Sequence, residues 1–229
     1  MWNINNFECL FYIDNYNNNY DLLSACFLNH ITGNYIVSIY NNLSYIRKDS
    51  IIKIYNFNKL LTKTIILNEN TFFISSYYDN RESKSYILTG NRGCVTSYDF
   101  NTSLIYHKYQ EYEHYNMHKN IFINDYEETI KLIESSDVYI RIWNFHSAEI
   151  LMKIYINNTQ SICLWNIDYL FVGGNKKIIL IHLKYGIVVD EIYGHNKVIS
   201  IQKLIHPKFG ECLVSQGGET DFIFIRKIN

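Results

Sequence analysis

The chain has 229 residues, of which 48% are hydrophobic, and it carries 21 tyrosines and 13 phenylalanines. This apolar content is enough for one large all-β domain or two small ones, and it excludes a disordered protein. The net charge of −1 provides no general attraction for nucleic acid or for an anionic membrane, so we expect neither as a partner.

The five cysteines are widely spaced and form no CxxC pair. This usage is typical of buried, reduced thiols in the cytoplasm or nucleus. No apolar run approaches the ~20 residues that a membrane helix needs. The N-terminus lacks the basic start of a signal peptide. We therefore expect a soluble protein that is cytoplasmic or nuclear.

In chain order, short strand-like segments rich in β-branched and aromatic residues follow one another between turn formers. The first segment, Glu8–Asp14, stands before any complete group of strands. Five groups follow, and each opens with an alternating run: Ser24–His30, Phe72–Asp79, Ile121–Asp125, Ser161–Asp168 and Val198–His206. A second and a third strand follow in every group, and a fourth strand in all but the last.

The third strands recur with a regular period. Their marker residues are separated by 43, 45, 39 and 44 residues, and they are Tyr55, Tyr98, Trp143, His182 and Arg226. Four-stranded propeller blades repeat about every 40–45 residues. A two-sheet sandwich also has many short strands but does not predict such a period. The sequence therefore predicts an all-β fold of about five blades.

The clearest repeat covers residues 129–156, in which Asp137 lies six residues before Trp143-Asn144. It resembles one repeat of the WD-repeat β-propeller family, with Trp143-Asn144 where the family has Trp-Asp. The resemblance implies a structural relay of hydrogen bonds among a His, a Ser, an Asp and the Trp of a blade. Its candidates here are Ser135 or Ser136, Asp137, Trp143 and His118, with Asp49 in the first blade and His195, Ser215 and Asp221 in the last.

The last group has no fourth strand, and Glu8–Asp14 has no group of its own. Closing a ring with a strand from the other terminus hides exposed sheet edges. We therefore expect Glu8–Asp14 to be the outer strand of the C-terminal blade, in a single propeller domain over residues 1–229. Seven blades are usual in the family, so an open ring and a part of a longer propeller are the alternatives.

The resemblance implies a non-catalytic scaffold or adaptor that binds other proteins or peptides through loops held on a rigid disc. We expect no cofactor. The predicted partner-binding residues lie in the connections between strands and are Arg47, Lys48, Arg92, Tyr112, His118, Lys176, Lys177 and His195. The tyrosine-rich segment Tyr109–Tyr115 is a further candidate for partner contact.

Two alternatives involve chemistry. Some five-bladed propellers are glycoside hydrolases, and Asp79, Asp125 and Asp168 follow the first strands of three groups, where they could provide an acid and a base. The same residues are more often turn caps. A metal site at His107, His114 and His118 is the second alternative, but their spacings of seven and four do not match the usual short zinc pairs. We therefore expect neither catalysis nor a metal.

Overall fold

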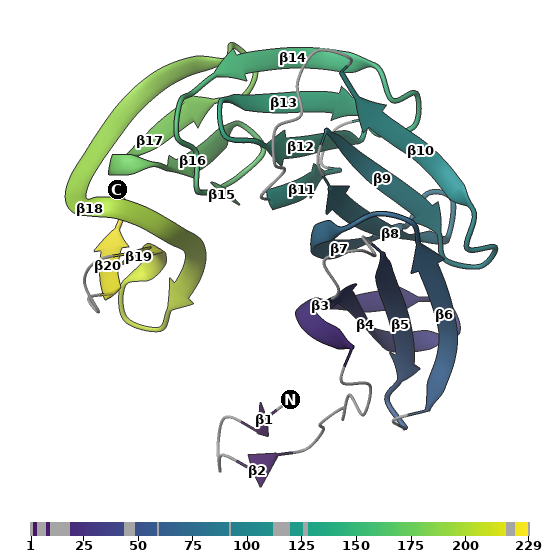
Figure 1. Cartoon of the computed structure of the whole chain (residues 1–229). Coiled ribbons are helices and arrows are strands. Elements are labelled where there is room, and N and C mark those ends of the chain that lie inside the picture. The colour runs from purple at the N-terminus through teal and green to yellow at the C-terminus, as the bar shows by residue number, and fades with distance from the viewer. Residues whose placement is uncertain are drawn as a thin grey trace. The chain divides into compact units, whose positions relative to one another are not determined.

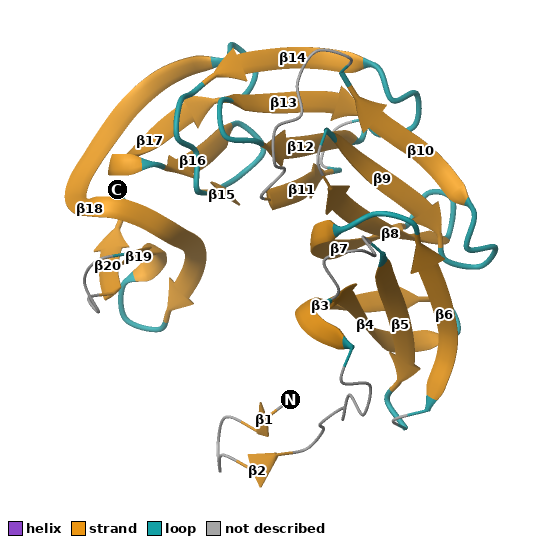
Figure 2. Ribbon diagram, in the orientation of Figure 1, coloured by secondary structure: helices purple, strands orange, loops and turns teal. Residues whose placement is uncertain are grey.

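The structure is a computed structural model that describes residues 2–3, 8–9, 19–43, 49–58, 60–91, 93–111, 120–125, 128–218 and 223–228. The regular elements of these residues are β-strands (Figures 1 and 2). Within them, no helix is long and apolar enough to cross a membrane. The chain divides into two compact units, Met1–Lys108 and Tyr109–Asn229.

The first unit contains two four-stranded antiparallel sheets in which the strands follow chain order. One sheet consists of β3 (Tyr20–His30), β4 (Gly33–Asn42), β5 (Ser50–Asn56) and β6 (Leu61–Leu67). The other consists of β7 (Thr71–Asp79), β8 (Lys84–Asn91), β9 (Cys94–Asp99) and β10 (Ile105–Gln110), whose last two residues fall in the second unit. The sheets pack face to face through alternate residues such as Val37, Ile52, Ile74 and Ile87.

The second unit begins with the sheet of β11 (Asn120–Asn124), β12 (Lys131–Ser135), β13 (Tyr139–Asn144) and β14 (Ile150–Tyr155). A six-stranded sheet follows, with β15 (Ser161–Leu164), β16 (Tyr169–Gly173), β17 (Asn175–His182), β18 (Ile187–His206), β19 (Gly210–Gly217) and β20 (Ile223–Lys227). Ile133, Ile142, Leu170 and Ile179 belong to the core between the two sheets.

Each predicted group thus forms one antiparallel meander, and the five markers lie on β5, β9, β13, β17 and β20. The prediction of an all-β fold built from four-stranded sheets is confirmed. A meander needs only contacts between neighbouring segments, which is why strand patterns and turn residues were sufficient to predict it.

Strand β18 is the main departure from the predicted elements. The fourth strand of one predicted group and the run Val198–His206 that opens the next were expected as two strands, but the chain continues as one strand of 20 residues. Its first part pairs with β17 and its second part, from Val198 on, pairs with β19. Gly194 has a φ of +142°, which residues with a side chain rarely adopt, and the register shifts between Val198 and Ser200. The strand therefore passes from one repeat to the next without a loop.

The segment expected to close the ring, Glu8–Asp14, is described at its first two residues. The two described residues of Glu8–Asp14 form β2 (Glu8–Cys9), which pairs with β1 (Trp2–Asn3) in a separate two-stranded sheet. A partner so close in the chain costs little loop-closure entropy. Residues 10–18 lie outside the described residues, so ring closure by this segment and the single domain over residues 1–229 stay predictions.

The cysteines agree with the expected free thiols where their side chains are described. Cys94, Cys163 and Cys212 are buried, and Cys26 is partly buried.

Candidate functional site

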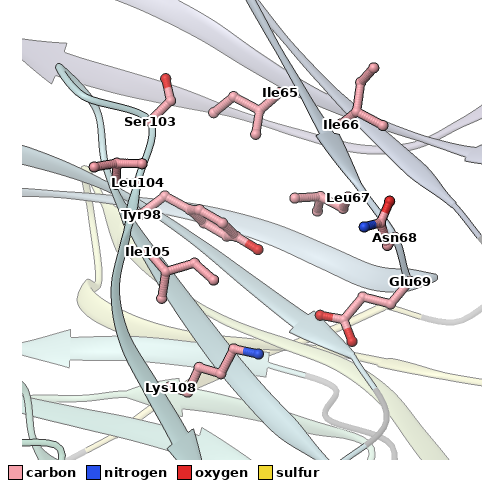
Figure 3. A pocket seen from close by; sticks show the side chains of 10 residues that line it. All are labelled: Ile65, Ile66, Leu67, Asn68, Glu69, Tyr98, Ser103, Leu104, Ile105 and Lys108. Carbon is pink, nitrogen blue, oxygen red and sulfur yellow. The ribbon is translucent and has the colours of Figure 1, made fainter.

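The first unit contains an open groove of about 740 Å³ between the outer strands of its two sheets (Figure 3). One wall is the end of β6 and the residues after it, Ile65–Glu69. The other wall is Ser103–Ile105 with Lys108, and Tyr98 of β9 lies between the two walls. The groove is therefore formed by residues of two consecutive repeats.

The surface of the groove is mainly aliphatic. Leu67 and Tyr98 are buried, whereas Ile66, Leu104 and Ile105 are 67%, 68% and 51% exposed. Aliphatic side chains this exposed, gathered around one hollow, are typical of a surface that binds another molecule.

The connection from β9 to β10 holds the rim residue Leu104 in place. The Asp99 carboxylate accepts hydrogen bonds from the backbone N–H and the hydroxyl of Thr102, at 2.8 and 3.0 Å. Ser103 follows with a φ of +61°, and the Asp99 N–H donates to the Leu104 carbonyl at 3.0 Å. An aspartate at the start of a turn commonly caps it in this way. The loop is thus ordered by its own sequence.

Phe100 and Lys63 fasten this loop to the rest of the unit. The Phe100 ring is buried and lies 4.7 Å from the His30 ring and 4.9 Å from the Tyr35 ring. The Lys63 ammonium of β6 donates to the carbonyls of Phe100 and Asn101, at 2.6 and 2.8 Å. Lys63 lies on β6, the strand that continues into one wall, and the loop leads into the other, so this link helps to fix the spacing of the two walls.

Charged and polar groups line the far end of the groove. Glu69 and Lys108 have opposite charges there (Figure 3), so this end has no net preference for an anion or a cation. Burial raises the pKa of the Tyr98 phenol, and the charge of Glu69 contributes a smaller increase. The tyrosine is therefore neutral at physiological pH. The arrangement favours an apolar ligand over an ionic one.

The second unit contains a buried ion cluster that the sequence analysis missed. Glu134 of β12 and Arg141 of β13 lie directly opposite each other, and Nη1 of Arg141 is 2.8 Å from Oε1 of Glu134. Nε of Arg141 lies 3.0 Å from Glu111, but not at a hydrogen-bonding angle. Lys153 reaches Glu111 at 2.8 Å and lies 4.1 Å from the centre of the Tyr139 ring.

This cluster joins three neighbouring strands of one sheet to the residue that follows β10. Its inner pair is fully buried and its outer pair, Glu111 and Lys153, is partly exposed. Buried charges must be paired, because an isolated charge in the interior is very costly. We interpret the cluster as structural.

The relay predicted from the WD-repeat resemblance stays a prediction, and its described members in this blade are Ser135, Ser136, Asp137 and Trp143. Trp143 is buried, but its indole N–H has no hydrogen-bond partner, and neither has the hydroxyl of Ser135. The Ser136 hydroxyl instead closes its own turn by bonding the N–H and carbonyl of Tyr139. His118 lies outside the described residues, so its share in a relay stays untested.

Relay candidates were also predicted in the first and the last blade. Asp49 accepts hydrogen bonds from Tyr20 and Asn42 at 2.8 and 2.7 Å in the first unit. Ser215 bonds Arg226 at 2.5 Å, and His195 lies within β18, before the part of that strand that pairs with β19. Asp221 lies outside the described residues.

Few of the predicted partner-binding residues can be placed. Arg47, Lys48, Arg92, Tyr112 and His118 lie outside the described residues, and so does most of Tyr109–Tyr115. Lys176 is exposed and has a φ of +64°. Lys177 pairs with Glu191 at 2.5 Å, and Tyr193 donates to the same carboxylate at 2.5 Å. Hydrogen bonds from Lys177 and Tyr193 hold the pKa of Glu191 below its usual value.

Tyr109, the first residue of the tyrosine-rich segment, is a core residue rather than a surface contact. It is fully buried, and its hydroxyl donates to the Phe145 carbonyl at 2.7 Å. Its ring makes an edge contact with Trp143 at 6.1 Å. The expectation that this residue contacts a partner is therefore wrong, because β10 turns its side chain into the core.

The carboxylates considered for catalysis give that alternative no support. Asp79 accepts from the N–H groups of Arg81 and Glu82, at 2.9 and 3.4 Å, so it caps a turn. Asp168 is exposed at the turn before β16. Asp125 follows β11 and is half-buried. Of the histidines considered as metal ligands, His107 lies in β10, and His114 and His118 lie outside the described residues.

A scan against protein-family models gave no match, and a search of curated proteins gave none either. Among solved structures, the chain is similar to Saccharomyces cerevisiae Sqt1, a WD40 protein, with a TM-score of 0.68 and 16% sequence identity. The similarity covers 86% of this chain and 57% of Sqt1, so the chain spans little more than half the length of that relative. At this identity the likeness shows the fold alone, which is a WD-repeat-like β-propeller fold.

Proposed function

We propose that the chain is a non-catalytic scaffold that binds other proteins, and that the groove between β6 and β10 receives an extended, apolar segment of a partner. The observation that carries the proposal is the set of exposed aliphatic side chains around this groove, Ile66, Leu104 and Ile105. Covering one such side chain contributes about 2 kcal/mol before the costs of association.

Rigidity of the groove supports this function. The Asp99 cap, the buried Phe100 ring and the Lys63 link hold both walls before a partner arrives. A preformed site loses little conformational entropy on binding, which leaves more of the contact energy for affinity. The turn residues predicted from the sequence, Arg47, Lys48, Arg92, Tyr112, His118, Lys176, Lys177 and His195, remain in the proposal as a second contact surface.

The test is quantitative affinity capture from cell extract with four folded baits: the unchanged chain, Ile66→Asp, Leu104→Asp and Leu61→Asp. Leu61 is the matched control, because it is 51% exposed on the same strand but does not line the groove. A buried carboxylate in the groove is expected to weaken a partner at least about tenfold. The proposal predicts proteins that the unchanged chain and Leu61→Asp retain and that both groove variants lose. Equal capture by all four baits, or no stable partner, would contradict it.

A further inference from the structure

Two opposite charges face each other at the polar end of the groove between β6 and β10. Glu69 follows β6 on one wall, and Lys108 of β10 belongs to the other. Figure 3 shows the carboxylate and the ammonium directed toward the same space from these two walls. No ion pair joins them, and neither has one with any other residue that the structure describes. This end of the groove therefore presents a charged acceptor and a charged donor to a ligand.

The Glu69 carboxylate acts inside the groove and not only at its rim. Glu69 is half-buried, and the buried Tyr98 lies between the two walls (Figure 3). Burial raises the pKa of the Tyr98 phenol, and the charge of Glu69 adds a smaller increase. The carboxylate is therefore close to the base of the groove. A ligand group must enter the groove to reach it.

Neither a charged group nor a purely apolar one complements this end of the groove. An ammonium on the ligand would be attracted to Glu69 but repelled by Lys108, and a carboxylate would meet the reverse. A hydrocarbon side chain would cover both charges without replacing the hydrogen bonds that they make to water. The site therefore favours one neutral group that both donates and accepts hydrogen bonds.

A carboxamide has this property. Its NH₂ group has two donors and its carbonyl oxygen accepts, so one amide can donate to the Glu69 carboxylate while it accepts from the Lys108 ammonium. Hydrogen bonds to charged partners are about twice as strong as those between neutral groups. Among side chains, asparagine and glutamine carry this group.

We propose that the partner segment in this groove places the side-chain amide of a glutamine or an asparagine between Glu69 and Lys108, beside aliphatic residues that cover the rest of the groove. The inference rests on the function proposed above and deepens it, because it names the side chain that sets specificity. Every second side chain of an extended segment points to the same side, so the amide and its aliphatic neighbours enter the groove together. Exchanging the amide for leucine, glutamate or lysine should weaken binding about tenfold or more.

The experiment selects peptides from a displayed random library on the full-length chain and discards those that Ile66→Asp also binds. The retained peptides are sequenced, and the affinity of the tightest is measured with its amide residue intact and replaced. The same selection is made on Glu69→Lys, on Lys108→Glu and on the double variant that carries both changes. Lys184→Glu is the control with the same change of charge, at an exposed lysine after β17.

We expect amides to be enriched on the unchanged chain, on Lys184→Glu and on the double variant, since an amide that turns over exchanges its donor and its acceptor. Glu69→Lys should select acidic peptides and Lys108→Glu basic ones, and these opposite preferences also show that both variants are folded. If no selected peptide depends on Ile66, the function proposed for the groove fails together with this inference. The inference alone is overturned if peptides depend on Ile66 but no amide is enriched on the unchanged chain, or if the single variants keep the preference for an amide.

Discussion

Replacing Arg141 by methionine tests the buried ion cluster most directly. The side chains of Arg141 and Glu134 are 2% and 0% exposed, and their charged atoms are 2.8 Å apart. The variant keeps the length of the buried side chain but leaves the Glu134 carboxylate without its guanidinium. Breaking a buried pair from one side costs about 3–5 kcal/mol, because the remaining charge is still desolvated. We expect the free energy of unfolding of the second unit to fall by that amount.

The assay is urea denaturation followed by tryptophan fluorescence. Two of the three tryptophans, Trp143 and Trp165, lie in the second unit and report on it. The double variant Arg141→Met with Glu134→Leu removes both charges, so it should recover most of the lost stability.

Lys153→Met is the control from the same cluster. Its pair with Glu111 is 28% and 29% exposed, so removing it should cost less than about 1 kcal/mol. If Arg141→Met costs no more than Lys153→Met, or if the double variant is as unstable as Arg141→Met, then desolvation of Glu134 does not govern the cluster and the reasoning is wrong.

Three other outcomes follow from single contacts. Tyr109→Phe should lower the stability of the second unit by about 1–2 kcal/mol in the same denaturation assay, because the buried Phe145 carbonyl loses its donor. Lys177→Met should raise the pKa of Glu191 toward its ordinary value in a carboxyl NMR titration. The pair stabilises the folded chain above the ordinary glutamate pKa, and this stabilisation is lost as the pH falls through the lowered pKa of Glu191. Burial raises the pKa of Cys26 from 9.0 to about 11, so at pH 8 this thiol should alkylate about 100-fold more slowly than in the unfolded chain, as mass spectrometry can measure; equal rates would contradict this.

The repeat period predicted the sheets because each one is made by neighbouring segments of the chain. The alternation of apolar residues and the turn formers specify such local pairings. Contacts between consecutive sheets depend on which of their outer strands lie side by side, and no short sequence pattern specifies this arrangement. One feature of the sequence does indicate the groove. Ile65 and Ile66 are adjacent on β6, whereas strict alternation would place a polar residue at one of these two positions.

The Glu134–Arg141 pair could have been found from the sequence. Both charges interrupt apolar strands, and they are equally distant from the centre of the turn that joins those strands. Counting outward from the turn would have placed them opposite each other. The continuous β18 could not have been foreseen, because Gly194 reads as a turn former and its role here depends on the strands on both sides.

Strand β18 has a consequence for how the protein opens. Its 20 residues bond β17 along one part and β19 along the other. Two repeats joined by a loop can fray separately, whereas repeats that share a backbone segment must break bonds in both when that segment detaches. The C-terminal end of the chain should therefore unfold as one cooperative block, with mechanical load on either repeat transmitted to the other.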